Sequence, residues 1–284
     1  MDGLLLVDKP GGWTSHDVVA RTRRAAATRR VGHAGTLDPM ATGLLVLGVN
    51  RATRLLTYVV GADKTYTATI RLGQSTVTDD ADGDVTSEAD PSGVARGEID
   101  AVLQTLRGDI EQVPSAVSAI KIDGKRAYAR VRSGEDVDIP ARPVTIHRFD
   151  IAVERRQTDW IDLDVIVECS SGTYIRALAR DLGERLGVGG HLTALRRTRV
   201  GPFAIEGAQS LDAVMNDGPA IISITEAATA LFPVWQPEPD VVLDARYGRR
   251  VPAPDQLTAL ADGEGHVVGL IDATGKPVLV FAPA

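Results

Sequence analysis

Apolar residues form two kinds of pattern that predict β-strands. Residues 4–7 and 44–49 are short, almost wholly apolar runs, as is typical of strands buried on both faces. Residues 65–72 and 160–169 instead alternate apolar and polar positions, as strands with one exposed face do. Residues 191–203 form a further strand-like segment with several basic side chains and a Gly-Pro stop. These segments predict a sheet of buried and half-buried strands.

A second pattern, with apolar residues three and four positions apart, predicts helices between the strands. Thr14 or Ser15 is placed to cap a helix that runs through SHDVVARTRRAA. Residues 98–106 and a stretch around 209–230 also have helical character. The segment SSGTYIRALARDLGERLG changes from strand to helix. Its apolar stripe consists of Ile175, Leu178, Leu182 and Leu186.

The order of these elements predicts the fold class. Helices and antiparallel strands interleave without βαβ regularity, so we expect an α+β fold with a mixed, mostly antiparallel central sheet and flanking helices. Prolines at 233, 237 and 239 predict a linker, and short strands in ARYGRRVP and GEGHVVGLIDATGKPVLVF predict a small β domain. We expect a large domain over residues 1–230, with a mobile insertion at about 118–143, and a small domain over 231–284.

The distribution of charge is more informative than the formal net charge of −7. Residues 206–284 hold four basic and eleven acidic residues, whereas the rest of the chain is neutral overall. Residues 21–54 carry seven arginines against one acid, Asp38, and residues 176–199 carry six arginines against two acids. Two basic patches suit a polyanion gripped along its backbone, although two solvated helix faces have the same charge pattern.

Composition disfavours several classes of protein. No run approaches the roughly 18 apolar residues of a membrane span, and the opening MDGLLLVDKP does not have the pattern of a signal peptide, so we expect a cytoplasmic protein. Cys169 is the single cysteine and the five histidines are scattered, so we expect neither a disulfide nor a metal site. The sequence contains no phosphate-loop, dinucleotide-binding, nucleophile-elbow or paired-cysteine motif, and we expect no cofactor.

The stretch GHAGTLDPMATG places one carboxylate, that of Asp38, between glycine-rich turns. An Asp before a Pro is typical of a helix N-terminus, where the carboxylate caps free N–H groups. The same carboxylate is suited to covalent catalysis if an arginine holds it ionised and aimed. Arg176 is the candidate partner, with an ordinary structural ion pair as the alternative. Tyr174 and Tyr66 complete this group of candidate residues.

Four blocks of the sequence resemble, in order, the TruB family of bacterial tRNA pseudouridine-55 synthases. They are LLLVDKPGGWTSHDVV, GHAGTLDPMATGLLVLGVNRATRL, KTYTATIRLGQSTVTDDADG and CSSGTYIRALARDLGERLGVGGHLTALRRTRVGPF. Together with SAIKIDGKRAYARVRSG they cover most of residues 3–203. The resemblance implies the pseudouridine synthase fold and a C-terminal PUA-like domain in reduced form. It implies an isomerase that converts the T-loop uridine of tRNA to pseudouridine, and an insertion that closes over that loop.

The resemblance also assigns roles at the reacting centre. Asp38 is implied to be the nucleophile, Arg176 its ion-pair partner and Tyr66 the aromatic platform for the flipped base. Whether Asp38 attacks C1′ of the ribose or C6 of the base, or assists formation of a glycal, stays open. Tyr174 and Leu195 are implied to line the same pocket, although ordinary packing also explains these two residues.

Binding of a tRNA T-arm is the other implied property, with neither a guide RNA nor an obligate protein partner. From size and charge we expect a monomer. His33 is implied to help remodel the T-loop, with an ordinary loop histidine as the alternative. The acidic C-terminal domain predicts weak RNA contact. The candidates for contacts to phosphates are Arg23, Arg24, Arg29, Arg30, Arg196, Arg197 and Arg199.

Two alternative functions remain open from the sequence. One is a sister pseudouridine synthase that acts on another RNA or works with a guide RNA and partner proteins. The other is an RNA-folding module in which the fold binds tRNA and Asp38 has no chemical role.

Overall fold

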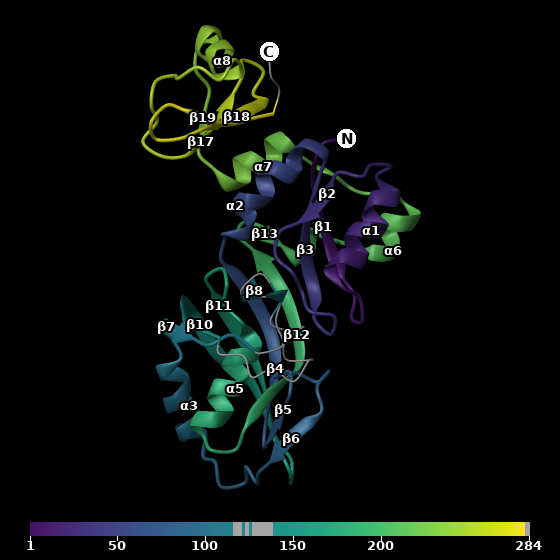
Figure 1. Cartoon of the computed structure of the whole chain (residues 1–284), viewed down its shortest axis with the longest axis vertical. Coiled ribbons are helices and arrows are strands. Elements are labelled where there is room, and N and C mark those ends of the chain that lie inside the picture. The colour runs from purple at the N-terminus through teal and green to yellow at the C-terminus, as the bar shows by residue number, and fades with distance from the viewer. Residues whose placement is uncertain (116–120, 123–124, 127–138, 282–284) are drawn as a thin grey trace. The chain divides into compact units, whose positions relative to one another are not determined.

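The computed structural model describes residues 1–115, 121–122, 125–126 and 139–281 (Figure 1). The chain divides into two compact units, which are described one at a time. The first comprises Met1–Leu37, Leu44–Val60 and Gly201–Ala284, and the second comprises Asp38–Gly43 and Gly61–Val200. The predicted mobile insertion at about 118–143 lies largely outside the described residues. Within the described part of the chain, no helix is long and apolar enough to cross a membrane.

The first unit begins with the two predicted buried strands. Its N-terminal elements are β1 (Gly3–Lys9), α1 (Ser15–Ala25), β2 (Val31–His33), the part of β3 (Thr42–Val49) from Leu44 onward, η1 (Asn50–Leu55) and α2 (Leu56–Val60). β1 and β3 are neighbours in the sheet, and β2, which the apolar pattern did not predict, pairs antiparallel with the end of β3. Helix α1 starts as predicted, because Thr14 and Asp17 form a capping box.

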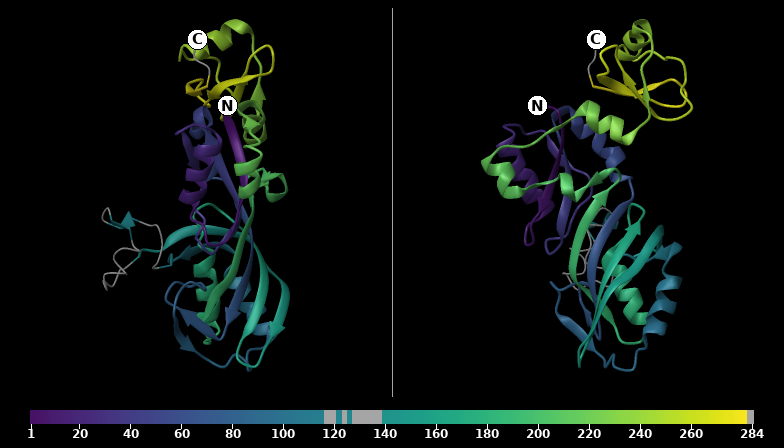
Figure 2. Two further views of the ribbon diagram at one scale, coloured as in Figure 1. Left: turned by 90° about the vertical axis from the view of Figure 1, so that its right-hand side faces the viewer. Right: turned by 180° about the vertical axis from the view of Figure 1, so that it is seen from behind.

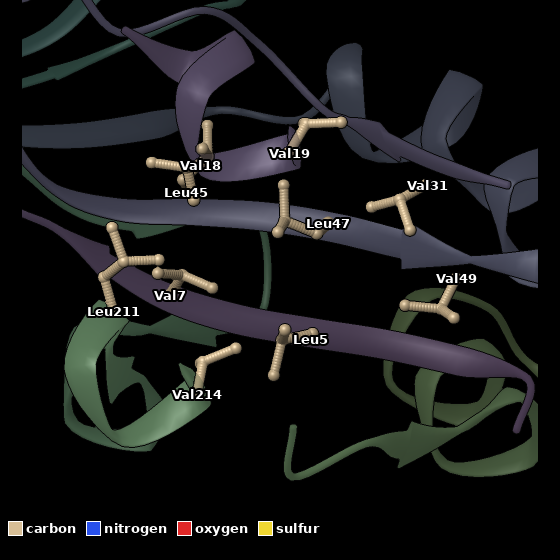
Figure 3. Close-up of a cluster of buried hydrophobic side chains, with 10 residues drawn as sticks. All are labelled: Leu5, Val7, Val18, Val19, Val31, Leu45, Leu47, Val49, Leu211 and Val214. Carbon is tan, nitrogen blue, oxygen red and sulfur yellow. The ribbon is translucent and has the colours of Figure 1, made fainter. Parts of the chain in front are cut away.

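A cluster of buried aliphatic side chains joins these elements (Figure 3). Leu5 of β1 and Leu47 of β3 are fully buried, and Val18 of α1 and Val214 of α6 (Leu211–Asn216) pack in the same cluster. Each aliphatic side chain of this size contributes about 1.5–3 kcal/mol when it is fully buried. The cluster therefore packs α1 and α6, which are far apart in the sequence, against the same two strands, β1 and β3.

The chain returns to the first unit after residue 200. The elements there are β13 (Phe203–Ala204), η2 (Ile205–Gly207), β14 (Gln209–Ser210), α6, β15 (Ile222–Ser223) and α7 (Ile224–Leu231). The predicted helical stretch around 209–230 is therefore two helices. Short β14 and β15 both pair with β1, parallel and antiparallel respectively, and a Ser at the end of each caps the next helix.

The last part of the chain forms a four-stranded sheet in the order β16-β17-β18-β19. Its elements are β16 (Val234–Trp235), α8 (Pro239–Arg246), β17 (Thr258–Ala261), β18 (Val267–Ile271) and β19 (Pro277–Val280). Figure 2 shows α8 beside this sheet, and Val242 of α8 packs in a buried cluster with Leu260. Two predictions were wrong here. The proline-rich linker contains β16, and Pro239 starts a helix that includes the first residues of the supposed strand ARYGRRVP.

The second unit is built on an antiparallel sheet in the order β12-β4-β11-β10-β7. Its elements are β4 (Lys64–Leu72), β5 (Gln74–Thr76), β6 (Val85–Glu88), α3 (Arg96–Thr105), β7 (Gly108–Gln112), β8 (Lys121–Ile122), β9 (Lys125–Arg126), β10 (Arg142–Arg156), β11 (Ile161–Cys169), α5 (Ile175–Arg185) and β12 (Gly190–Val200). In β4 and β11 the even spacing of buried residues confirms the predicted alternation. Helices α3 and α5 contact each other, and α5 packs on β12 and β4 (Figure 1).

These observations confirm the α+β fold with a large mixed sheet whose pairings are mostly antiparallel. Parallel pairs are β16 with β17 in the separate four-stranded sheet and, within the large sheet, β1 with β14 and the start of β3 with β12. The last of these pairings brings Thr42 and Gly43 against Arg196 and Arg197, directly after the stretch that contains Asp38.

Candidate active site

Asp38 lies in a turn at the start of the second unit. Its carbonyl oxygen accepts a hydrogen bond from the N–H of Ala41 at 3.1 Å, and Pro39 and Met40 form a bend. The next element is strand β3, which begins at Thr42. The helix-cap interpretation of Asp38 is therefore wrong, because residues 39–49 contain no helix whose N–H groups the carboxylate could cap.

Gly43 fixes the end of this turn against β12. Its φ is +101°, and a Cβ built on it would lie 2.3 Å from the carbonyl oxygen of Arg197. Both facts require glycine, since an L-residue would be strained at that φ and would also collide with the neighbouring strand. The glycine therefore allows β3 to pair with β12 immediately after the Asp38 turn.

Arg176 is the partner of Asp38, as the sequence predicted. Its Nε lies 3.1 Å from Oδ2 of Asp38, and its side chain is only 6% exposed. Arg176 is the second residue of α5, which follows Tyr174 as the N-cap residue. The buried amide of Gln112 holds that N-cap residue by its backbone: Oε1 accepts from the N–H of Tyr174 at 2.8 Å, and Nε2 donates to its carbonyl oxygen at 3.1 Å.

A second carboxylate, that of Asp80, contacts the same guanidinium. Nη1 of Arg176 lies 3.4 Å from Oδ2 of Asp80 and donates a 2.8 Å hydrogen bond to the carbonyl oxygen of Thr78. The other oxygen of Asp80 accepts hydrogen bonds from the hydroxyl of Thr78 and from the N–H of Asp82. One buried arginine therefore joins the Asp38 turn to the loop at residues 78–82.

The two carboxylates differ in their access to solvent. The side chain of Asp38 is 38% exposed, whereas that of Asp80 is 5% exposed. Asp38 is therefore the carboxylate that an incoming molecule can reach, while Asp80 faces the guanidinium from within the protein. Burial, with the negative charges of Asp80 and Asp38 nearby, raises the pKa of Asp82.

Tyr66 lies on β4 directly opposite Arg197 on β12, and both side chains are buried. Burial raises the pKa of the Tyr66 phenol, while Arg197, which hydrogen-bonds the phenol, acts in the opposite direction. Asp38 is close enough to add to the increase. The phenol is therefore neutral at physiological pH and shares the electrostatic environment of the candidate nucleophile.

Lys64 precedes Tyr66 by two residues on the same side of β4. Its side chain is buried and donates a 2.7 Å hydrogen bond to the carbonyl oxygen of Ala62. Burial, aided by the positive charge of Arg197, lowers the pKa of Lys64 to about 8. Loss of its proton at mildly alkaline pH would therefore reduce the positive charge on this side of the sheet.

The remaining pocket candidates lie on the same unit. Tyr174 is half-buried at the start of α5, and Leu195 is buried on β12 opposite Ala68 of β4. The second unit thus contains Asp38, Tyr66, Arg176 and both of these residues. Their roles toward a bound base stay predictions.

His33 belongs to the first unit, at the end of β2. Its ring contacts that of His16 in a T-shaped arrangement, with centroids 5.5 Å apart and an interplanar angle of 84°. His16 lies in the first turn of α1, so the partner of His33 is set by the capped start of that helix. The role of His33 in remodelling an RNA loop remains a prediction.

The seven arginines predicted to contact phosphates differ in exposure. Four of them are exposed in the first unit, at and after the end of α1: Arg23, Arg24, Arg29 and Arg30. Arg196 and Arg199, on β12, are half-buried, and Nε of Arg199 donates to the hydroxyl of Thr65 at 3.0 Å. Arg197 is only 1% exposed. Its burial contradicts the expectation of a surface phosphate contact, since the side chain is buried beside Tyr66 of the neighbouring strand β4.

Sequence reasoning missed Asp80 and Gln112. Asp80 stands in TVTDDADGD, which has the composition of a solvated acidic loop. The third block of the resemblance runs through that loop, but nothing in the sequence distinguishes Asp80 from the three other acids of the stretch. Gln112 has no motif of its own. It holds Tyr174 only because the fold brings the end of β7 to the start of α5, and this tertiary contact cannot be read from the local sequence.

Two family models match the chain. The TruB family pseudouridylate synthase N-terminal domain matches residues 23–175, and the tRNA pseudouridylate synthase B C-terminal domain matches residues 176–228. The first match spans more than half of the chain and contains Asp38, Tyr66 and Asp80. The site described above therefore lies in the part of the chain that carries the family resemblance.

Curated relatives match this chain over most or all of its length. The chain is 57% identical to a tRNA pseudouridine synthase B of Arthrobacter sp. (strain FB24), covering 100% of this chain and 98% of the relative. It is 62% identical to the protein of the same name from Streptomyces griseus, covering 82% and 80%. Among solved structures, Cbf5 in a Cbf5-Nop10-Gar1 complex has a TM-score of 0.72 and 26% identity, covering 99% of this chain and 85% of that one. The chain thus belongs to the TruB family of pseudouridine synthases, which are isomerases.

Proposed function

We propose that this enzyme converts uridine 55 in the T-loop of tRNA to pseudouridine, with Asp38 as the nucleophile and without a guide RNA. The observation that carries the proposal is the half-exposed carboxylate of Asp38 held by the buried guanidinium of Arg176. A carboxylate that is both fixed in position and open to solvent is suited to attack a bound nucleoside. tRNA is favoured as substrate because the relatives at 57% and 62% identity are named tRNA pseudouridine synthase B.

The reaction is an isomerisation within one nucleotide. The N1–C1′ bond breaks, the uracil turns while it stays bound, and a C5–C1′ bond forms. C5 then loses its proton and N1 gains one, so that no other substrate is consumed. The base must leave the stack before any of this can happen. Asp38 has three routes open to it, which are attack at C1′, attack at C6, and assistance in forming a glycal.

Arg176 has two functions in this proposal. It keeps Asp38 ionised, because a neighbouring positive charge favours the carboxylate form. It also fixes the direction of that carboxylate, since the guanidinium is itself held by Asp80 and by the carbonyl oxygen of Thr78. Preorganisation of this kind is the main source of catalysis where no cofactor contributes.

Tyr66 is the proposed platform for the detached uracil. Stacking on an aromatic face stabilises a flipped base by about 1–3 kcal/mol. The neutral phenol is able to take part in proton transfer at C5 through its hydroxyl, which is hydrogen-bonded to Arg197. Tyr174 and Leu195 are proposed to complete the pocket around the base.

The RNA backbone is proposed to contact the exposed arginines of the first unit and the half-buried pair Arg196 and Arg199. His33 is proposed to fill space among displaced bases of the T-loop. Residues 231–284 are proposed as a reduced PUA-like domain with weak RNA contact. The guide-dependent alternative is disfavoured because identity to Cbf5 is 26%, against 57% to a tRNA pseudouridine synthase B over the full length. We further propose a cytoplasmic monomer.

The test is to map pseudouridine in unmodified tRNA transcripts incubated with the purified protein alone. We expect pseudouridine at position 55, and none in a matched transcript that carries cytidine there. Product at a different position would support the sister-enzyme alternative. A protein that binds the transcript but forms no pseudouridine would support the RNA-folding alternative.

A further inference from the structure

Asp79, between the two residues that contact Arg176, has an unusual backbone conformation. Its φ is +58°, in the left-handed region that residues other than glycine seldom adopt. Thr78 on one side offers its carbonyl oxygen to Arg176, and Asp80 on the other side offers its carboxylate. The left-handed turn at Asp79 is what directs both groups to one guanidinium. Such conformations persist where surrounding contacts hold them.

The side chain of Asp79 is held by a second arginine of α5. Nη1 of Arg180 lies 3.4 Å from Oδ2 of Asp79, and the two side chains are 20% and 14% exposed. Arg176 and Arg180 are four residues apart, so they lie on the same face of the helix. Arg176 therefore contacts Asp80 and Arg180 contacts the adjacent Asp79 of the same loop.

Arg180 is itself fixed from two further directions. Its Nη2 donates to the carbonyl oxygen of Val113 at 2.7 Å and lies 2.7 Å from Oδ1 of Asp181. The backbone of Asp79 is held too, because its carbonyl oxygen accepts a 3.0 Å hydrogen bond from the N–H of Leu192 on β12. Burial raises the pKa of Asp79, while Ser115, Arg180 and Arg176 each act in the opposite direction. Arg180 is thus one of the groups that favour the charged form of Asp79.

We infer that Asp79 and Arg180 are positioning residues for the isomerisation, which hold the loop at residues 78–80 around Arg176 and thereby set the direction of Asp38. The inference rests on the proposed function, since it concerns the same site. Neither residue touches the reacting atoms. Loss of the pair is expected to let the loop relax from its left-handed turn, so that Arg176 loses two of its acceptors and Asp38 loses its fixed partner.

The first experiment compares single-turnover rates of the full-length variants Asp79→Asn and Arg180→Met on the tRNA transcript. Arg185→Met is the matched control, because Arg185 is on the same helix but exposed. Asn accepts the left-handed conformation and removes only the charge. We expect the rate constant to fall about 10- to 100-fold in both variants, with the KM for tRNA within about twofold of wild type and the control unchanged.

The double variant Asp79→Asn/Arg180→Met separates positioning from stability. Arg180→Met alone leaves a buried carboxylate without its arginine, and the second change removes that charge. We expect the double variant to regain thermal stability while its rate stays low. If rates of both single variants stayed within about twofold of wild type, or if the rate recovered together with stability, the inference would be overturned.

A second readout does not require turnover. In ¹⁵N-labelled protein, the Nε–H resonance of Arg176 reports its ion pair with Asp38. We expect this resonance to move toward the solvent-exposed position in Arg180→Met and to stay unchanged in Arg185→Met. An unmoved resonance in Arg180→Met would overturn the inference. A wild-type protein inactive on tRNA would instead overturn the proposed function and leave this test intact.

Discussion

Arg176 and Asp38 are separated by 3.1 Å, from Nε to Oδ2, and the arginine is buried while the aspartate is half exposed. The geometry differs from an ordinary surface ion pair because the arginine also contacts Asp80, whose side chain is 5% exposed. A surface pair contributes little to stability, whereas a buried charge without a partner is costly. The arginine is therefore needed for the fold of the loop as well as for the reactive carboxylate.

Replacing Arg176 tests whether this arginine supports both the stability of the loop and the activity of Asp38. Arg176→Met is expected to lower the free energy of unfolding by about 3 kcal/mol, because Asp80 is left as an uncompensated buried charge. Addition of Asp80→Asn is expected to recover part of that loss without restoring activity. Denaturant unfolding and single-turnover rates measure the two effects. Unchanged stability in Arg176→Met would show that Asp80 does not depend on this arginine.

Arg176→Lys is the conservative counterpart. A lysine is a point charge that is unable to direct fixed N–H groups to two carboxylates and a carbonyl oxygen at once. We expect a fall in rate of about 100-fold, with tRNA affinity retained. A lysine variant with the wild-type rate would show that charge alone, and not guanidinium geometry, supports Asp38.

Tyr66→Phe separates stacking from proton transfer. The ring that stacks on the base is kept, while the hydroxyl that Arg197 contacts is removed. We expect tRNA affinity to stay within about twofold and the single-turnover rate to fall about 100-fold or more, as is typical when an acid–base group is lost. Substrate deuterated at C5 of the target uridine supplies the control. An isotope effect no larger in the variant than in wild type would contradict a role for this hydroxyl at C5.

Lys64 gives the protein a predictable alkaline response. Its pKa in the folded state is about 8, below the ordinary value of 10.5. Between these two values the folded protein has lost the proton and the unfolded chain still binds it, so stability from this group rises with pH. The increase is up to about 1.4 kcal/mol per pH unit.

The measurement is the free energy of unfolding of wild type and Lys64→Met between pH 7 and 10. The difference between the two proteins isolates this residue from other groups that titrate in the same range. We expect the wild type to gain stability relative to the variant above pH 8. Parallel pH profiles would mean that Lys64 keeps its ordinary pKa.

Gly43→Ala tests the reason for the glycine after the Asp38 turn. The φ of +101° and the 2.3 Å distance between an added Cβ and the Arg197 carbonyl oxygen are expected to destabilise the variant by about 2 kcal/mol or more. Gly12→Ala is the matched control, since Gly12 has a φ of +78° but no atom within 4 Å of an added Cβ. A cost no larger than that of the control would show that the close approach to β12 relaxes freely.

Much of this architecture could be predicted from local patterns. The apolar run at 44–49 and the alternation at 65–72 fix β3 and β4, and the capping box at Thr14 fixes the start of α1. The errors occur where tertiary contact outweighs local signal. Val234 and Trp235 look like linker between prolines but pair with β17. Pro39 looks like a helix start, yet the chain passes directly into β3.

The candidate site was predictable only in part, for the same reason. Asp38 and Arg176 came from the motif blocks, and the structure brings them together. Asp80 was missed because its burial depends on the left-handed turn at Asp79 and on two arginines of α5. Arg197 was assigned to the RNA from its charge, but its side chain is buried on the same face of the sheet as Tyr66 of the neighbouring strand.

The most direct test of the account is a single comparison of Asp38→Ala with wild type. Pseudouridine formation at position 55 of an unmodified tRNA transcript and the Kd for that transcript are measured on the same preparations. We predict that the rate of product formation by Asp38→Ala is at least about 10⁴-fold below that of wild type, because the carboxylate acts in the chemical step. The Kd is expected to stay within about threefold of wild type. An Asp38→Ala protein that still formed pseudouridine at that position would contradict the central claim.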